Sequence, residues 1–551
     1  MKKVISFMLC LVIAFVATIS TVAQVTIDEA PDALKSKFKT VQLNCDMNKV
    51  VATATSDDGT SAVIGYDKNE KISLWMIKGV YVTKSTADIL ALAERNLDYP
   101  KNDYISTDEV YVSDVYYFDG AFYIICCIEY HCTCDDYDID DPVFEGSHDY
   151  AVATVLLRTV DGKDFTAIKM PSIADTIYNT ERGVNIDKFD GKLIFAANSA
   201  AFTQIDESDS GVSYYYTSED SINWTRHESI KVESKSLYGY DLDYYSWKYQ
   251  GISDDGTAVF RLFVDLSALV AAGYGKPYGY YCTSDFTTYQ KLPDSVFGDE
   301  YWVNDQCCVN SFLPASGDRS AVLFQTLKID HGFFVEVKGL NVFMADDVAG
   351  NWVQKVDYDG SGRYYRYFRS INDEYCLMLD TGTDVNVYKW NGTNGEVSVD
   401  TTNINPKDFV YTTGYNYNGN YIWYMIYKNN SLAVSNNMLD STVKFDLPMA
   451  FKQFIIIGDI GILVGEKVYA IDMNRFSALV MGEELPEITY GDADGDGSIT
   501  LSDVTLLLQQ IAGWNVAIVG NADANDDDNI DLSDVTLLLQ HIAGWDVVLG
   551  K

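Results

Sequence analysis

DADGDGSITLSDVTLLLQQIAGW, from Asp492 to Trp514, returns almost unchanged as DANDDDNIDLSDVTLLLQHIAGW, from Asp523 to Trp545. The second copy begins 31 residues after the first. Each copy joins an acidic loop to an apolar run whose hydrophobic residues recur at intervals of three and four, the spacing of one helix face. The repeat therefore predicts two equivalent loop–helix units near the end of the chain.

Polar oxygen ligands occupy positions 1, 3, 5 and 12 of a twelve-residue loop in both copies. This is the spacing of an EF-hand calcium loop, in which position 7 adds a backbone carbonyl oxygen. The pattern predicts one Ca²⁺ ion in each loop, and its repetition before two similar helices favours calcium sites over solvated acidic loops. The predicted ligands are Asp492, Asp494, Asp496, Ser498 and Asp503 in the first loop and Asp523, Asn525, Asp527, Asn529 and Asp534 in the second.

One amphipathic helix is expected behind each loop, and no helix is expected before it, which differs from a complete EF-hand. Gly513 and Gly544 are expected to end the helices in a left-handed cap. The expected apolar stripes are Val504, Leu507, Leu508 and Ile511 in the first helix and Val535, Leu538, Leu539 and Ile542 in the second.

Two such loop–helix units with Asp at position 12 resemble a type I dockerin, the module that attaches cellulosomal proteins to cohesin modules of a scaffoldin. The resemblance covers residues 490–551, and it implies a small all-α calcium-binding domain with a cohesin as its partner. Asp528 departs from the usual residue at position 6, and Leu–Ser replaces the more familiar Ser–Thr pair at positions 10 and 11. The resemblance places the cohesin-binding surface on Leu501, Ser502, Gln509, Gln510, Leu532, Ser533, Gln540 and His541.

The first residues carry the features of an export signal. Lys2 and Lys3 precede an apolar run from Val4 to Val16, and the small-x-Ala sequence at 21–23 comes directly before Gln24. The run is too short to span a membrane. We therefore expect a signal peptide over residues 1–23 and a secreted, extracellular protein.

The chain is strongly acidic. It holds 80 Asp and Glu against 40 Lys and Arg, which gives a formal net charge of −40. Such a surface repels nucleic acids and anionic membranes, so neither is expected as a partner. The same surface is compatible with divalent cations and with neutral ligands such as uncharged polysaccharide.

Residues 24–485 are expected to form one β-rich domain, joined to the C-terminal module by a linker over 486–489. Short runs rich in Tyr, Val, Ile, Thr and Phe alternate with turn residues. A turn followed by an apolar run recurs eight times, at spacings of about 60 to 70 residues early in the chain and 40 to 50 later. These turns are at Asp58–Gly59, Asp119–Gly120, Asp190–Gly191, Asp255–Gly256, Gly317–Asp318, Asn372–Asp373, Asn418–Gly419 and Gly458–Asp459.

A second repeated turn combines a polar, Asp-containing segment with an aromatic residue at its end. The four copies are RTVDGKDF, TSEDSINW, CTSDFTTY and MADDVAGNW, which end at Phe165, Trp224, Tyr289 and Trp352. They weakly resemble the Asp-box turns of sialidase-like β-propellers. With repeats long enough for four strands each, this favours a β-propeller of about seven blades, with six or eight as alternatives because the late repeats are short; the rival architecture is one or two β-sandwiches.

Adjacent cysteines are not expected to pair with each other. Cys126–Cys127 and Cys307–Cys308 lie on expected strands, where neighbouring side chains point to opposite faces. Whether the cysteines are buried thiols or form other disulfides is left open by the sequence.

The catalytic residues of the large domain are not identified by any motif. Glycosidic cleavage requires two carboxyl groups beside the bond, and the chain has too many acidic residues to select a pair. Two hypotheses remain. One is a glycoside hydrolase or lyase that the dockerin delivers to plant polysaccharide, with hydrolysis of O-glycosyl bonds preferred; the other is a non-catalytic propeller that binds polysaccharide or protein.

Overall fold

A computed structural model gives the structure of the chain. It describes residues 24–25, 27–29, 40–78, 81–98, 105–132, 150–170, 184–197, 201–204, 214–228, 236–237, 240–241, 244–264, 279–293, 306–313, 315, 319–330, 335–359, 364–371, 373–380, 385–402, 409–418, 420–427, 431–436, 441–447, 451–483, 489–494, 498–512, 518, 521–527 and 529–550. Within these ranges, every helix is too short or too polar to cross a bilayer.

The first four large sheets are antiparallel; the strands of sheets 1 and 2 follow one another in the chain, whereas one strand of sheet 4 lies, in the sequence, between two strands of sheet 3. Sheet 1 contains β4 (Met47–Thr55), β5 (Ser61–Asp67), β6 (Ile72–Lys78) and β7 (Tyr81–Lys84). Sheet 2 contains β8 (Ile105–Phe118), β9 (Ala121–Cys132), β10 (Tyr150–Thr159) and β11 (Thr166–Lys169). Sheet 3 contains β12 (Val184–Phe189), β13 (Lys192–Ala197), β15 (Tyr214–Ser218) and β16 (Thr225–Glu228). Sheet 4 contains β14 (Ala201–Gln204), β19 (Tyr244–Ile252), β20 (Ala258–Val264), β21 (Gly279–Thr283) and β22 (Gln290–Lys291). A separate two-stranded hairpin is formed by β17 (Ser236–Leu237) and β18 (Tyr240–Asp241).

The next four sheets also consist mainly of strands that follow one another in the chain, and three of them add one strand from the N-terminal segment. Sheet 5 contains β23 (Gln306–Leu313), β24 (Ala321–Asp330), β25 (Val335–Ala345) and β26 (Val353–Asp359). Sheet 6 contains β27 (Tyr364–Ile371), β28 (Glu374–Asp380), β29 (Val385–Asn391), β30 (Ser398–Thr402) and β1 (Gln24–Val25). Sheet 7 contains β31 (Phe409–Tyr417), β32 (Asn420–Tyr427), β33 (Ser431–Asn436), β34 (Ser441–Asp446) and β2 (Ile27–Glu29). Sheet 8 contains β35 (Phe451–Ile457), β36 (Ile460–Gly465), β37 (Val468–Asp472) and β3 (Val41–Leu43).

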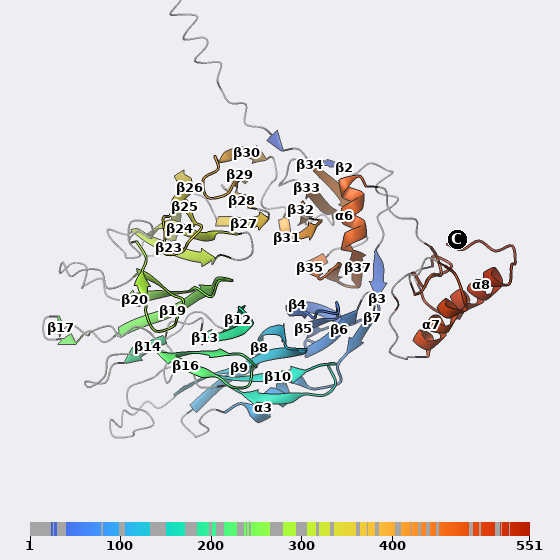
Figure 1. Cartoon of the computed structure of the whole chain (residues 1–551), viewed down its shortest axis with the longest axis horizontal. Coiled ribbons are helices and arrows are strands. Elements are labelled where there is room, and N and C mark those ends of the chain that lie inside the picture. Colours follow the sequence, from blue (N-terminus) through green and yellow to red (C-terminus); the bar gives the residue numbers. More distant parts are fainter. Residues whose placement is uncertain are drawn as a thin grey trace, which may run out of the picture.

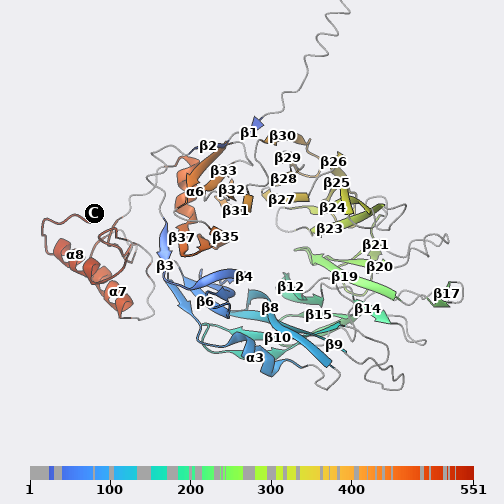
Figure 2. The ribbon, with the colours of Figure 1, turned by 180° about the vertical axis from the view of Figure 1, so that it is seen from behind.

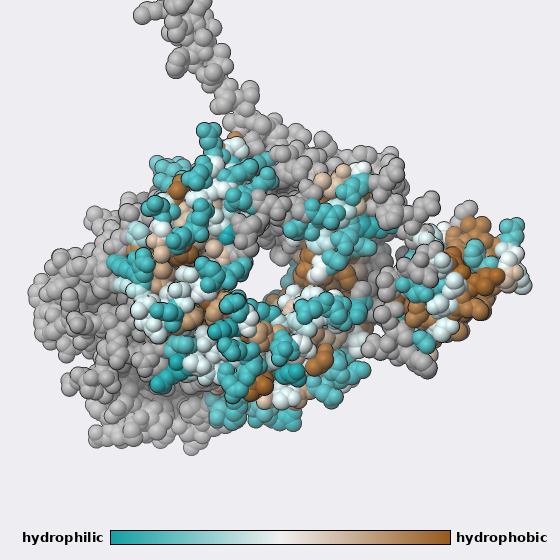
Figure 3. All heavy atoms as spheres, in the orientation of Figure 1, coloured by the Kyte–Doolittle hydropathy of each residue, from teal (hydrophilic) through white to brown (hydrophobic). Residues whose placement is uncertain are grey.

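The sheets form a ring around a central opening (Figures 1, 2 and 3), with strands such as β4, β12, β27 and β31 on the inside. This is the arrangement of a β-propeller, so the mainly-β prediction is confirmed and the β-sandwich alternative is wrong. The described residues contain eight sheets of four or five strands, one more than the preferred count of about seven blades. The late repeats are shorter because sheets 6, 7 and 8 have short loops between their strands.

The N-terminal segment closes the ring. Strand β3 supplies the fourth strand of sheet 8, pairing antiparallel with β37, while β4 begins sheet 1 four residues later. On the inside, the Gln453 side chain of β35 bridges to β4: its Oε1 accepts from the Val50 N–H at 2.8 Å and its Nε2 donates to the Val50 carbonyl at 3.1 Å. The first and last sheets are therefore joined at both their outer and inner strands.

Along a strand, successive side chains pack alternately against the preceding sheet and the following sheet of the ring. In β9, Ile124 and Cys126 pack between sheets 1 and 2, whereas Ile125 and Cys127 pack between sheets 2 and 3. A strand buried on both faces in this way has an almost continuous apolar sequence. The expectation that Cys126 and Cys127 do not pair is confirmed, since both are buried free thiols.

The repeated turns that are fully described lie between the first and second strands of their sheets, except that Asp255–Gly256 joins β19 to β20 in sheet 4. Their backbone is left-handed at Asp119 and Gly120, with φ of 43° and 74°, and at Asp190 and Gly191, with φ of 41° and 70°. Two positive-φ residues in succession match the right-handed twist of a tight hairpin. Gly317, Asp318, Asn372 and Gly419 lie outside the described residues.

The four Asp-containing turns all join the third and fourth strands of their sheets. In each, the Asp carboxylate accepts backbone N–H groups within the turn; Asp220, for example, accepts from Ile222 at 2.8 Å and from Asn223 at 2.7 Å. The closing aromatic packs toward the preceding sheet, as Trp224 of sheet 3 does in the cluster shared with sheet 2. These turns therefore help to join consecutive sheets.

Two helices accompany the ring. The first is α3 (Ile89–Asn96), which Asp88 caps by accepting from the Ala91 N–H. The second, α6 (Met473–Met481), was not predicted. It packs on sheets 7 and 8 through Phe476 and Leu479. Its ends carry ordinary signals, since Asp472 caps the start and Gly482 ends it at φ 76°.

Candidate functional site

The C-terminal module contains two helices of equal length, α7 (Leu501–Ile511) and α8 (Leu532–Ile542), which lie beside the ring in Figure 1. They pack against each other over a small apolar core drawn from both copies of the repeat. Its buried members are Ala493, Val504, Leu507, Ala522, Ala524, Val535 and Leu538. The two predicted loop–helix units are thus present, and they form one packed body.

The first loop brings three of its predicted ligands together. One carboxylate oxygen each from Asp492, Asp494 and Asp503 lies within 4.8 Å of the other two, and Asp492 and Asp503 are buried. Asp503 is oriented by the backbone, because its Oδ1 accepts from Ala493 N–H at 2.8 Å and its Oδ2 from Thr500 N–H at 2.7 Å. The cluster has the donor type and size that suit a Ca²⁺ ion.

The sequence also predicted two further ligands in the first loop, Ser498 and Asp496. Ser498 is described and exposed, whereas Asp496 lies outside the described residues. Asp503 also acts as N3 of a capping box with Thr500, so a single carboxylate both orients the loop and starts α7. The helix therefore begins at Leu501, one residue before Ser502.

The second loop has the same construction. Asp534 is buried, and its Oδ1 accepts from Ala524 N–H at 2.8 Å while its Oδ2 accepts from Asp531 N–H at 2.8 Å. The Asp527 N–H donates both to Asp523 Oδ1 at 3.2 Å and to Asn525 Oδ1 at 3.0 Å. Oxygens from positions 1 and 3 are thereby turned toward the inside of the loop.

One described residue of the second loop has a left-handed backbone. Asp526, at position 4, has φ 58°, and an Asp tolerates this region better than most residues other than Gly. Asp528, the position-6 residue that departs from the dockerin pattern, lies outside the described residues, as do Gly513 and Trp514. Gly544 ends α8 at φ 76°, as predicted, and the Trp545 N–H donates to the Gln540 carbonyl at 3.0 Å.

Both helices carry the same exposed apolar face. Leu501 and Leu532 are each 60% exposed, and Leu508 and Leu539 are each 44% exposed. Of the twelve exposed large apolar side chains among the described residues, eight lie between residues 501 and 548. Figure 3 shows them as brown spheres on the module, whereas the visible ring surface is mostly teal and white.

This face differs in part from the predicted one. Leu501, Ser502, Leu532, Ser533 and His541 are exposed, and Gln509, Gln510 and Gln540 are half-buried, so all eight predicted residues have accessible surface. However, Leu508, Ile511, Leu539 and Ile542 were assigned to the inward stripe and are exposed instead. The helices are too short and the core too small to bury a second apolar row, and this row extends the outer face.

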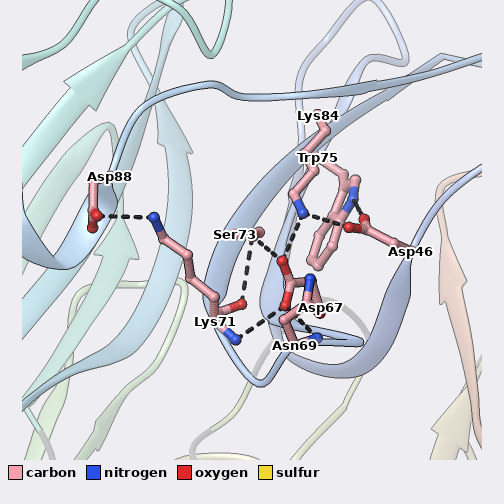
Figure 4. Close-up of polar contacts among 8 residues, drawn as sticks. All are labelled: Asp46, Asp67, Asn69, Lys71, Ser73, Trp75, Lys84 and Asp88. Atoms are coloured by element: carbon pink, nitrogen blue, oxygen red, sulfur yellow. Dashed lines mark hydrogen bonds and ion pairs between the residues drawn. The ribbon is translucent and has the colours of Figure 1, made fainter.

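A cluster of charged residues on sheet 1 was not predicted, and it joins the start of β4 to β6 and β7 (Figure 4). Lys84 Nζ lies 2.6 Å from Asp46 Oδ2 and 2.8 Å from Asp67 Oδ2, and it lies over the Trp75 ring. Asp67 also accepts from the Asn69 and Lys71 N–H groups. With its acceptors satisfied inside one sheet, the cluster has the properties of a structural network.

We expect Lys84→Met to destabilise the protein by about 1 to 3 kcal/mol. Lys84 is one-third exposed but Asp67 is buried. The loss of folding stability should therefore be larger than for breaking a surface ion pair and smaller than for breaking a buried one. Lys84 is the main cause that lowers the pKa of Asp67 to about 2. This stabilisation is present above the unfolded-state pKa of about 3.9 and is lost as the pH falls toward 2, so Lys84→Met should matter less at pH 2 than at pH 7.

Urea unfolding at both pH values would test this, with Lys71→Met as the matched control. Lys71 pairs with Asp88 at 2.8 Å, but both side chains are more than half exposed, so its removal should cost at most about 1 kcal/mol. Equal losses for the two substitutions would show that burial of Asp67 has no influence.

Inner strands of the ring hold a second group that the sequence did not reveal. Asp114, which is exposed, lies on β8, and Asp187, which is half-buried, lies on β12; partial loss of hydration raises the pKa of both carboxyl groups. The charge of Asp187 raises the pKa of Asp114 further. Tyr249 on β19 is 3% exposed, and burial together with the charge of Asp187 raises the pKa of its hydroxyl. No sequence signal could have selected these residues, which are 73 and 62 positions apart.

Comparisons with known proteins give likenesses of structure only. No family model matches the chain, and no curated protein matches it. Similar solved structures include the Dos1 propeller, at 10% identity over 82% of this chain and 98% of that chain with a TM-score of 0.39. A structure of YCF48 bound to a D1 peptide is 10% identical over 82% of this chain and 99% of that one, with a TM-score of 0.33. An ulvan lyase of polysaccharide lyase family PL25 is 9% identical over 67% of this chain and 95% of that one, with a TM-score of 0.33.

Proposed function

We propose that the chain is a secreted component of a cellulosome, attached through a C-terminal dockerin to a scaffoldin cohesin and taking part in the breakdown of plant polysaccharide. The observation that carries this proposal is the duplicated, exposed apolar face of α7 and α8. Contiguous exposed apolar surface on a small domain is characteristic of a protein–protein interface. Its duplication in both helices is what the dockerin resemblance leads us to expect.

Calcium is part of the proposal. Asp492, Asp494 and Asp503 in the first loop, with Asp523, Asn525 and Asp534 in the second, supply the hard oxygen donors that Ca²⁺ takes. Bound Ca²⁺ would neutralise the converging carboxylates and hold each loop against its helix. The chain itself supplies the caps at Thr500 and Asp531 that start the helices.

For the ring, we propose hydrolysis of O-glycosyl bonds in a neutral polysaccharide. Attachment to a cellulosome supports a polysaccharide role, and the acidic surface disfavours anionic polymers. The carboxyl groups on the inner strands favour hydrolysis over simple binding, because such cleavage uses two carboxyl groups near the bond.

The proposal is tested with the mature chain, residues 24–551. Calorimetric titration should detect calcium-dependent binding to a cohesin from the same source. Incubation with xylan, mannan, xyloglucan and pectin should release new reducing ends from at least one of the neutral polymers. Absence of cohesin binding would refute the dockerin assignment, and absence of both release and retention on every polymer would refute the role of the ring.

A further inference from the structure

The His227 ring of β16 is held between aromatic rings of two neighbouring sheets. On its own sheet it stacks on Tyr215, its partner across β15, with ring centroids 5.3 Å apart and planes 16° apart. On sheet 4 it contacts Phe286, in the turn between β21 and β22, at a centroid distance of 5.2 Å. Its Nε2 shares a hydrogen bond of 2.7 Å with the Thr217 hydroxyl. A half-buried imidazole therefore lies at the joint between sheets 3 and 4.

Phe286 has a backbone conformation that costs free energy. Its φ is 56°, in the left-handed region that bulky residues rarely adopt. The equivalent position in the turn of sheet 2, directly after the Asp, is Gly162 at φ 72°. Strained residues persist only where their surroundings hold them in place. Besides His227, the rings that contact Phe286 are Tyr215 at 5.5 Å and Phe189 at 5.9 Å.

The elements packed against His227 offer it no opposite charge. In the described part of the chain, Thr217 is the hydrogen-bond partner of its ring, and no carboxylate bonds to it. The nearby phenol groups of Tyr215 and Tyr289 share a hydrogen bond of 2.6 Å, and burial raises the pKa of both, so they stay neutral. The Asp285 carboxylate accepts from two N–H groups of its own turn, each at 2.8 Å.

Protonation of His227 is therefore unfavourable while the joint is closed. Burial lowers the pKa of the imidazole, because a cation placed among aromatic rings loses hydration that no carboxylate replaces. In an opened joint the ring is hydrated and its pKa returns to about 6.5. Because the closed state binds a proton less readily than the open one, the joint is fully stable above this pH and loses stability as the pH falls below it.

We propose that His227 and Phe286 form a pH-sensitive latch between sheets 3 and 4, closed while His227 is neutral and opened when His227 is protonated. Opening withdraws Phe286 from the His227 and Tyr215 rings, which relieves its backbone strain. It also breaks the hydrogen bond between Tyr215 and Tyr289. An exported chain is exposed to the pH of its surroundings, so acid would loosen this one joint of the ring. The latch does not depend on the polysaccharide function proposed above.

Hydrogen exchange of the mature chain at pH 7.5 and pH 5.0, corrected for intrinsic exchange rates, tests the latch. At pH 5.0 a group with a pKa of about 6.5 in the open state favours opening by up to about thirtyfold. Protection of β16 and of residues 284–289 should fall by several-fold to about thirtyfold, while protection of β5 and β9 should not change. Protection that stays the same or rises at pH 5.0 in the wild type would overturn the proposal.

Three substitutions separate the charge from the packing. His227→Gln is neutral at both pH values and should remove the difference between them. Phe286→Gly suits the left-handed backbone but removes the ring, so protection should be low at both pH values. His541→Gln changes an exposed histidine of α8 and is the matched control, which should behave like the wild type.

Two further results would contradict the latch. A fall in protection at pH 5.0 that persists in His227→Gln would show that another group causes it. Wild-type protection in Phe286→Gly at pH 7.5 would show that Phe286 does not hold the joint. The wild-type and Phe286→Gly comparisons do not depend on the folding of His227→Gln.

Discussion

Removal of calcium is expected to unfold the C-terminal module while the ring stays folded. At a free concentration about a thousand times the dissociation constant, each ion adds about 4 kcal/mol to the stability of the module. Without the ions, the carboxylates of Asp492, Asp494 and Asp503 repel one another across less than 4.8 Å. Helices of 11 residues are marginal on their own, and the core between them has only seven buried apolar side chains.

Hydrogen exchange of the full mature chain measures this effect and contains its own control. After addition of EDTA, amide protection in α7 and α8 should fall by about three orders of magnitude or more, whereas protection in β5 and β9 should not change. Asp503→Ala should reproduce the loss in α7 with calcium present, since it also removes the acceptor for Thr500 and Ala493. Asp546→Asn, exposed and outside both loops, should have no effect. Unchanged protection in EDTA would refute the calcium sites.

Substitution of both outer leucines is expected to abolish cohesin binding, while substitution of either one should weaken it only about twofold. Leu501 and Leu532 start their helices and have the same exposure of 60%. A half-turn of the module would therefore present nearly the same surface, and a cohesin could bind in either of two orientations. Leu501→Asp removes one orientation, which halves the association constant.

The double substitution leaves no usable orientation. A carboxylate buried in an apolar pocket without a partner costs several kcal/mol, and about 4 kcal/mol corresponds to a thousandfold loss of affinity. Calorimetric titration with calcium present would compare Leu501→Asp, Leu532→Asp, the double variant and the control Asp546→Asn. Complete loss in one single variant would mean that binding uses one orientation, and full affinity of the double variant would mean that another face is used.

The sequence predicted local features of the ring better than its size. Turns such as Asp119–Gly120 and Asp190–Gly191 depend on residues that tolerate positive φ, and this tolerance is visible in the residue type. The repeated turns that are fully described lie at the same place in their sheets, except for Asp255–Gly256. The preferred blade count was nevertheless too low, because β3 comes from the N-terminal segment and completes a sheet whose other strands lie more than 400 residues later.

For the C-terminal module, the sequence by itself determined the two loops, the two helices and the acidic side chains that converge, since each of these depends on residues less than 12 positions apart. It could not determine which apolar row of each helix is covered: Leu507 is buried and Leu508 is exposed because the second helix packs on only one side. Asp114, Asp187 and Tyr249 were beyond its reach for the same reason. Their proximity comes from the packing of consecutive sheets in the ring, which brings together strands that no local pattern relates, and only the tertiary structure decides this.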